Sequence, residues 1–273
     1  MALSLQELLE RTTVKAERPE DLDPRALCRI METYSFLRIT GIVKPEAIHR
    51  SKAAFRENFS AANDHPSVGE DPQDLHRNYQ KLSVGGAQGY GVYRPRCIRT
   101  IYNPLWADDI FSMRDNFRHL ARTRNMLYGL PIDFAVDTID DGMWTAARLH
   151  HYPKGGGFLI SHKDNVVPRM QEERGYPAFY QLILVLTKKG IDFQEGGGFM
   201  VLDGQRYYFE SECEYGDIVV YDGRTEHGVG DIDPQEVFRH DSPEGRLVAF
   251  ATLYKTMKKG EKVWQGGQLN PRE

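Results

Sequence analysis

Cysteine is scarce in this sequence. Only Cys28, Cys97 and Cys213 occur among 273 residues, and neither a CxxC pair nor an even disulfide framework can be drawn from them. We therefore expect reduced thiols. Cysteine-based zinc and iron–sulfur sites are almost excluded, so a bound metal would have to use histidine, carboxylate and water. This directs attention to the nine histidines.

The sequence also lacks long apolar runs and a large excess of either charge. No hydrophobic run approaches the length of a membrane span, and the N-terminal segment carries charged residues from Glu7 onward. The formal net charge is -4 and the isoelectric point is near 6.2, which gives no overall electrostatic reason to expect nucleic acid or an anionic membrane as a partner. We expect a cytoplasmic protein that acts on a small-molecule substrate, and the oligomeric state is left open.

Helical spacing of apolar residues dominates the first half of the chain. Helices are expected over 4–12, 24–34, from Pro45 onward and over about 107–129, with a strand over 35–43. Residues 60–95 are polar and rich in glycine without periodicity, which is typical of a long surface excursion. We expect a substrate-lid loop over 84–106.

Short strands dominate the second half. Eight β segments occur between glycine, proline or acidic turns: TAARLHHY, GFLISH, AFYQLILVL, GGFMVL, QRYYFE, DIVVYD, EHGVG and RLVAFATLY. Closely spaced strands of this number favour two packed sheets over a parallel α/β fold. The predicted fold is mainly β, a double-stranded β-helix (jelly roll, cupin-like) core with N-terminal and supporting α-helices. One domain over 1–273 is expected, with a helical N-terminal part at 1–139, the β core at 140–257 and a tail at 258–273.

A candidate metal centre lies in this β half. His162 and Asp164 are two residues apart at the end of a predicted strand, so period-2 alternation sends both side chains to one face. About one such pair is expected by chance among nine histidines, so the context has to decide. The context is His227, 65 residues downstream in a strand and turn that return the chain toward the barrel. Two imidazoles and one carboxylate on one side of iron(II) leave the opposite positions open for a bidentate cosubstrate and dioxygen.

These segments resemble the iron(II)- and 2-oxoglutarate-dependent oxygenases with a double-stranded β-helix, particularly their prolyl-hydroxylase-like and phytanoyl-hydroxylase-like branches. HYPKGGGFLISHKDN looks like that family's strand, glycine-rich hairpin and HxD strand, and GDIVVYDGRTEHGV looks like the strand and turn that carry the distal histidine. The resemblance covers roughly 140–257 well and 24–60 loosely. It implies that His162, Asp164 and His227 bind Fe(II), with 2-oxoglutarate as cosubstrate and O2 as oxidant.

The resemblance further implies a basic residue that pairs with the far carboxylate of 2-oxoglutarate. Arg246 is the candidate, because it opens RLVAFATLY and a guanidinium can hold a carboxylate through two parallel hydrogen bonds. Arg239 competes with it, since its spacing of twelve residues from His227 is more usual for the family. Tyr152 is the candidate hydroxyl at the cosubstrate. The position of a further tyrosine in related enzymes matches Val185 here, and the resemblance leaves Gln181 as a substitute.

A second group of basic residues is Arg94, Arg96 and Arg99, which alternate with aromatic residues in YRPRCIRTIYNPLW. These arginines could hold an acidic substrate, but a solvated basic stretch balanced by the acidic residues that follow is the more common meaning of such a pattern. Interleaved basic and aromatic residues also suit single-stranded nucleic acid, which the overall negative charge disfavours.

The predicted activity is hydroxylation of an unactivated C–H bond of a small metabolite, such as an amino-acid derivative or a biosynthetic intermediate, with release of succinate and CO2. Two alternatives stay open. One is a cupin-type metalloenzyme that uses the same ligands without 2-oxoglutarate, and the other is a noncatalytic metal-binding sensor module.

Overall fold

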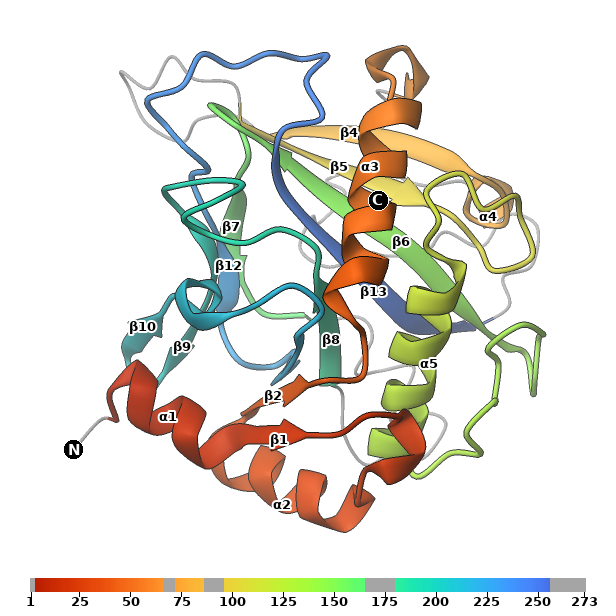
Figure 1. The fold of residues 1–273 in the computed structure, drawn as a ribbon, viewed down its shortest axis with the longest axis vertical. Helices are drawn as coiled ribbons and strands as arrows, with labels where there is room; N and C mark the ends of the chain where they lie inside the picture. The colour runs from red at the N-terminus through yellow and green to blue at the C-terminus, as the bar shows by residue number, and fades with distance from the viewer. Residues whose placement is uncertain (1–2, 66–71, 86–95, 165–179, 256–273) are drawn as a thin grey trace, which may run out of the picture.

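The computed structural model describes residues 3–65, 72–85, 96–164 and 180–255, and two β-sheets dominate it (Figure 1). The larger sheet has the strand order β1-β2-β11-β8-β13-β6-β5-β4-β3, and the smaller has the order β10-β9-β12-β7. The strands of the larger sheet are β1 (Thr13–Lys15), β2 (Phe36–Thr40), β3 (Asp64–His65), β4 (Tyr79–Gly85), β5 (Arg96–Tyr102), β6 (Met143–Pro153), β8 (Tyr180–Val185), β11 (Ile218–Asp222) and β13 (Gly245–Lys255). Those of the smaller sheet are β7 (Leu159–His162), β9 (Gly197–Leu202), β10 (Gln205–Tyr207) and β12 (His227–Gly230).

The helices are α1 (Leu5–Thr12), α2 (Pro24–Tyr34), α3 (Pro45–Asn58), α4 (Pro72–Leu75) and α5 (Arg114–Tyr128), with 3-10 turns η1 (Pro19–Asp21), η2 (Ala61–Asn63) and η3 (Phe209–Glu212). Local sequence fixes several of their ends. The Asp23 side chain accepts a hydrogen bond from the Arg25 backbone N–H at the start of α2, and Pro24 occupies the first helical position. Gly129 ends α5 in the left-handed conformation with φ of 64°.

Alternation along the strands divides the apolar side chains between two faces of the larger sheet. Ile183 and Val185 of β8 pack with Phe250 of β13 and with Met200 and Val229 of the smaller sheet. The two sheets therefore face one another and enclose an interior, which is the core of a jelly roll. We call this side of the larger sheet its inner face.

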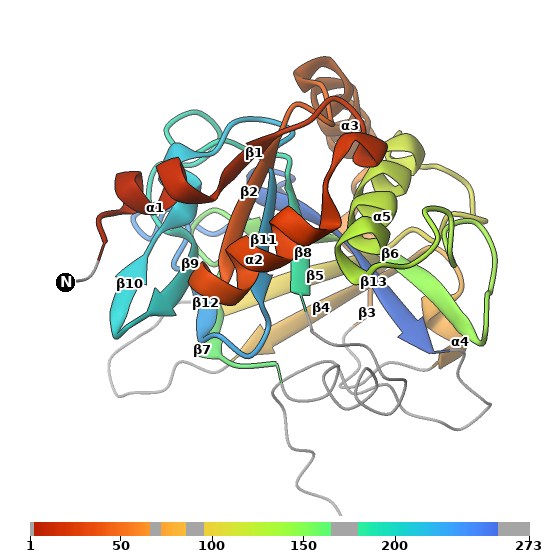
Figure 2. The same ribbon diagram turned by 90° about the horizontal axis from the view of Figure 1, so that it is seen from below.

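The intervening residues of the same strands point to the other side, which we call the outer face. Leu184 of β8 and Ala249 of β13 pack there with Ile48 of α3 and Leu120 of α5. The helices α2 and α5 contact one another. In Figure 2, α5 lies to the right, β7, β9, β10 and β12 group to the left, and α2 lies between them. Every position on these strands is thus assigned to the interior or to the helical layer by its parity.

The mainly β fold with supporting helices is confirmed. The N-terminal part at 1–139 was expected to be helical. It does contain the helices, but it also supplies strands β1 to β5 to the larger sheet. The loop expected over 84–106 is wrong for Arg96–Tyr102, which form β5 and pair with β4 and β6. The arginines made this segment look solvated, although its side chains alternate between the two faces of a strand. The helix expected over about 107–129 begins only at Arg114.

Residues 86–95 of the expected lid and the expected tail at 258–273 lie outside the described residues. Within the described ranges, no helix is both long and apolar enough to cross a membrane.

Candidate metal centre

The structure brings His162, Asp164 and His227 together. The strands β7 and β12 are antiparallel neighbours in the smaller sheet, and His162 lies directly opposite His227. Asp164 follows two residues after the first histidine, and one potential ligand atom from each of the three side chains lies within 4.8 Å of the other two. The Nε2 atoms of His162 and His227 are 3.7 and 3.8 Å from the Asp164 carboxylate oxygens. This arrangement could hold one metal ion.

Both imidazole rings are oriented by backbone carbonyl groups. Nδ1 of His162 lies 2.7 Å from the oxygen of Ile160, and Nδ1 of His227 lies 2.8 Å from the oxygen of Thr225. A carbonyl oxygen only accepts hydrogen bonds, so each Nδ1 carries the proton and donates it. The lone pair of each ring is therefore on Nε2, the atom that faces Asp164. In metal-binding histidines, a hydrogen bond from the ring nitrogen that does not bind the metal usually fixes the tautomer in this way.

Neighbouring side chains hold the carboxylate and the second histidine in place. The Gln181 amide donates a hydrogen bond of 2.9 Å to Oδ2 of Asp164, and the Asp164 backbone N–H donates to the Gly223 oxygen at 2.8 Å. The Tyr221 ring lies against the His227 ring with centroids 4.7 Å apart. Gln181 and Tyr221 are themselves cross-strand partners on β8 and β11. The larger sheet thus positions ligands that belong to the smaller one.

The charge state of the site also suits a metal. Burial lowers the pKa of His227, and the carboxylate of Asp164 offsets part of that effect. A neutral imidazole is the form that binds metal ions. Two Nε2 atoms and one carboxylate grouped on one side match the donor set of non-haem iron(II) sites. The residues present therefore fit such an ion.

Arg246 lies in the same interior. It is 1% exposed, it is the cross-strand partner of Tyr152, and its guanidinium carbon lies 4.8 Å from the centre of the tyrosine ring. Arg239, the competing candidate, lies exposed in the loop before β13. Among these two arginines, only Arg246 is on the inner face.

The separation of Arg246 from the metal ligands can be read along the smaller sheet. A Cβ atom built on Gly198 would lie 3.0 Å from Nη2 of Arg246. Gly198 pairs with Val229, whereas Met200 pairs with His227. Two residues of a strand span about 7 Å. The guanidinium of Arg246 and the side chain of His227 are therefore offset by about this distance along the strand direction. A five-carbon diacid can bridge a gap of that size.

Sequence reasoning missed the partner of this guanidinium. Nε of Arg246 lies 2.9 and 2.8 Å from the two carboxylate oxygens of Glu210, and Nη2 lies 2.5 Å from Oε1. The side chains of both residues are only 2% exposed. Glu210 follows β10 in a segment rich in glutamate, so nothing in its local sequence distinguishes it. The nearby run of glycines could have been the signal, because Gly198 leaves room for Arg246.

Of the three arginines proposed to hold an acidic substrate, the two that the structure describes do not lie at the triad. Arg94 lies outside the described residues. Arg96 forms a bidentate pair with Asp231. Asp231 follows the last residue of β12, whereas His227 is the first residue of that strand. Arg99 lies opposite His151, on the outer face, and binds Asp64 with both contacts at 3.0 Å. A substrate role for these residues stays a prediction.

Two further polar residues, which the sequence did not single out, lie on the inner face. Arg148 and His150 share the parity of Tyr152 on β6, and the Arg148 Nε donates to Nε2 of His150 at 3.2 Å. Nδ1 of His150 is buried without a hydrogen-bond partner within the described residues. Gln181, which was expected near the cosubstrate, donates its hydrogen bond to Asp164, and Val185 packs in the interior cluster. A role of Gln181 toward the cosubstrate stays a prediction.

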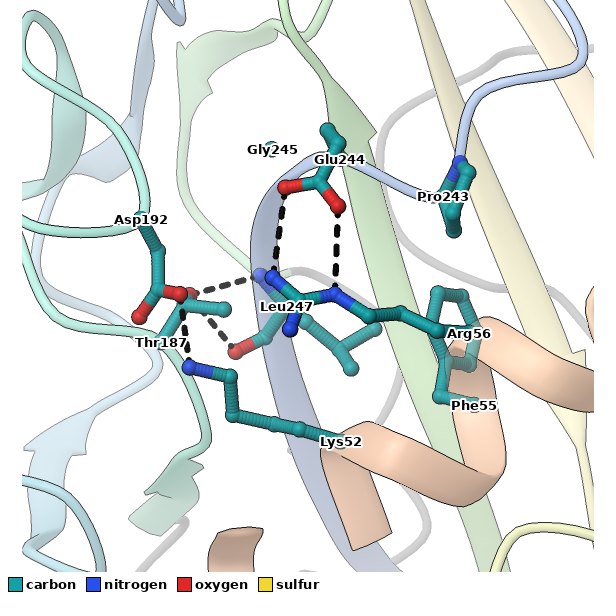
Figure 3. A pocket seen from close by; sticks show the side chains of 9 residues that line it. All are labelled: Lys52, Phe55, Arg56, Thr187, Asp192, Pro243, Glu244, Gly245 and Leu247. Atoms are coloured by element: carbon teal, nitrogen blue, oxygen red, sulfur yellow. Dashed lines mark hydrogen bonds and ion pairs between the residues drawn. The ribbon is translucent and has the colours of Figure 1, made fainter.

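A small cavity of about 10 Å³ lies on the other side of the larger sheet, between α3 and the start of β13 (Figure 3). Its charged side chains are paired within the chain. Lys52 Nζ lies 2.6 Å from the Asp192 carboxylate, and Arg56 pairs with Glu244 at 3.1 Å. This cavity contains none of the three candidate metal ligands and is a packing defect under the helix.

No family model and no curated protein matches the sequence. Solved structures do match the fold. A prolyl hydroxylase from Trichoplax adhaerens, solved with a fragment of a hypoxia inducible factor, matches with a TM-score of 0.51 over 84% of this chain and 87% of that chain, at 10% identity.

The non-heme alpha ketoglutarate dependent epimerase SnoN from nogalamycin biosynthesis matches with a TM-score of 0.48, 16% identity and coverage of 85% of this chain and 84% of that one. A Pseudomonas putida prolyl-4-hydroxylase matches with 0.47, 15% identity and coverage of 84% and 97%. At these identities the likeness concerns the fold, so the chain shares the jelly-roll fold of the Trichoplax prolyl hydroxylase.

Proposed function

We propose that this protein is a non-haem Fe(II)- and 2-oxoglutarate-dependent dioxygenase. The observation that carries the proposal is the triad of His162, Asp164 and His227, in which both Nε2 lone pairs face one carboxylate inside a jelly roll. A structural metal site would close its coordination sphere with a fourth protein ligand. Three ligands on one side leave positions for a cosubstrate and for O2.

Each protein group has a definite task in this proposal. The two histidines and Asp164 would hold iron(II), and Gln181 would keep the carboxylate in its binding orientation. Bound iron(II), with 2-oxoglutarate and O2, supplies the oxidising power to hydroxylate an unactivated C–H bond, with succinate and CO2 as the other products. The enclosed interior would exclude water and position the substrate.

Arg246 is proposed to bind the far carboxylate of 2-oxoglutarate, with Tyr152 beside it. Both residues lie on the inner face, and the guanidinium is displaced from His227 by a length that suits the cosubstrate. Burial raises the pKa of the Tyr152 hydroxyl to about 12, so this group stays protonated and can donate a hydrogen bond. The substrate is proposed to be a small metabolite, such as an amino-acid derivative or a biosynthetic intermediate.

A second candidate is a metalloenzyme with the same three ligands that does not use 2-oxoglutarate. The specific observation in its favour is Glu210, which already engages the Arg246 guanidinium. Under this alternative, Arg246 would be a buried structural cation, and iron would bind without any effect of the cosubstrate.

Anaerobic titration separates the two. Iron(II) and 2-oxoglutarate added together to the intact protein should produce the visible charge-transfer band of the chelate. His162→Ala and His227→Ala should abolish it, while His49→Ala, on the exposed side of α3, serves as the matched control and should retain it. Iron binding without any band would favour the second candidate, and absence of iron binding would refute both. The cytoplasmic location expected from the sequence stays a prediction.

A further inference from the structure

The buried pair of Glu210 and Arg246 has a charge balance that bears on cosubstrate binding, and the inference drawn from it rests on the function proposed above. The three contacts between the carboxylate and the guanidinium use Nε and Nη2 of the arginine. Oε2 of the glutamate also accepts a hydrogen bond of 2.8 Å from the Gly198 backbone N–H. Three of the four contacts therefore hold the carboxylate on one edge of the guanidinium, and the fourth ties it to β9.

The glycines of β9 make this placement possible. A Cβ atom on Gly197 would lie 3.0 Å from Oε2 of Glu210, and one on Gly198 would lie 3.0 Å from Nη2 of Arg246. Gly197 also has φ of 107°, a backbone conformation that side-chain-bearing residues rarely adopt. The chain thus brings a carboxylate and the cosubstrate anchor together in a place that larger residues would disturb.

A 2-oxoglutarate molecule bound at the metal would bring a second carboxylate to this guanidinium. One cation would then face two anions in an enclosed site where charges interact strongly. The distal carboxylate would have to share the guanidinium with Glu210 or displace it. Either way, the negative charge of Glu210 opposes the binding of any ligand with a distal carboxylate.

We propose that Glu210 is an affinity- and specificity-determining residue of the cosubstrate site, an internal counter-anion that competes with the distal carboxylate for Arg246. It stabilises the buried arginine when the site holds no cosubstrate. It also weakens the hold on succinate, which carries the same distal carboxylate, and so favours release of the product.

The test compares two 2-oxo acids on the iron(II)-loaded protein without oxygen. 2-Oxoglutarate has the distal carboxylate and 2-oxobutyrate lacks it, while both can chelate the metal. Glu210→Gln removes the charge with little change of shape and should lower the Kd for 2-oxoglutarate at least tenfold, with the Kd for 2-oxobutyrate changed less than twofold. Glu212→Gln, an exposed glutamate of the same turn, is the matched control and should change neither.

Binding of succinate to the iron(II) form, measured by calorimetry, should tighten in parallel in Glu210→Gln. Glu210→Asp provides a second variant if the glutamine protein does not fold, because the shorter carboxylate draws back from the guanidinium. It should give a smaller gain in affinity for 2-oxoglutarate. An unchanged or weaker affinity for 2-oxoglutarate, or an equal gain for both acids, would overturn the inference while leaving the proposed function intact. A wild-type protein that forms no chelate with either acid would overturn both.

Discussion

Two buried arginines on opposite faces of the larger sheet invite comparison. Arg246 and Arg99 are exposed by only 1% and 0%, and each pairs with a carboxylate of its own chain. Arg246 points to the inner face, toward the enclosed interior that holds the triad. Arg99 points to the outer face, where it lies over the Phe59 ring near α3.

The comparison shows that local chemistry does not separate the proposed cosubstrate anchor from an arginine of the packed outer face. Both side chains are desolvated, and both would leave a buried charge uncompensated if the partner were removed. The two arginines differ in strand parity, and therefore in what they face: the interior with the triad for Arg246, and the helical layer for Arg99. Four experiments test this distinction between the two faces.

The largest expected effect concerns the outer face. Arg99→Met removes the buried guanidinium beside Asp64, whose carboxylate keeps only Gln80 and His240 as side-chain partners. The free energy of unfolding, measured by urea denaturation, should therefore fall by about 3 kcal/mol. The Kd for 2-oxoglutarate should change less than twofold. A large loss of 2-oxoglutarate binding with unchanged stability would show that the outer face takes part in the site.

On the inner face, Arg246→Met should weaken 2-oxoglutarate binding about 100-fold, or about 2.7 kcal/mol, because the distal carboxylate loses its cation. Its stability should fall as well, since Glu210 is left unpaired. Anaerobic titration with 2-oxobutyrate should show a change below threefold. Equal losses for both acids would mean that Arg246 supports the site only through the fold.

Acid sensitivity provides the third test. Burial, followed by Arg99, lowers the pKa of His151 to about 3, below the value near 6.5 of an unfolded histidine. Its stabilising contribution is complete above pH 6.5 and is lost as the pH falls toward 3. Between pH 6.5 and 5 this amounts to about 2 kcal/mol. Urea denaturation of His151→Phe should show a shallower pH dependence than the wild type over that range, and parallel curves would contradict the assignment.

The smallest effect is expected at the positioning residue of the carboxylate ligand. Gln181→Leu removes the hydrogen bond to Asp164 and should weaken iron(II) binding about tenfold. Gln205→Leu, on the exposed strand β10, is the control. Anaerobic competition with a metal chelator measures both, and equal affinities would assign Gln181 to packing alone.

Much of the β half could be predicted from the sequence. Strand and turn patterns placed GGFMVL, DIVVYD and RLVAFATLY close to the observed β9, β11 and β13, because alternation and glycine turns are local signals. β5 was missed, since Arg96 and Arg99 are neutralised by Asp231 and Asp64 from distant segments. No local pattern reveals such pairing.

The three candidate metal ligands could be identified from the sequence, because an HxD pair, a returning strand and an arginine opening a further strand follow one another in the order that the family resemblance implies. Which arginine faces the interior and which carboxylate contacts it became visible only in the folded chain. The partners Glu210 and Asp64 are 36 and 35 residues from their arginines, and only the pairing of strands brings charges so far apart in sequence into contact. The same strand parity sends Arg246 to the triad and Arg99 away from it.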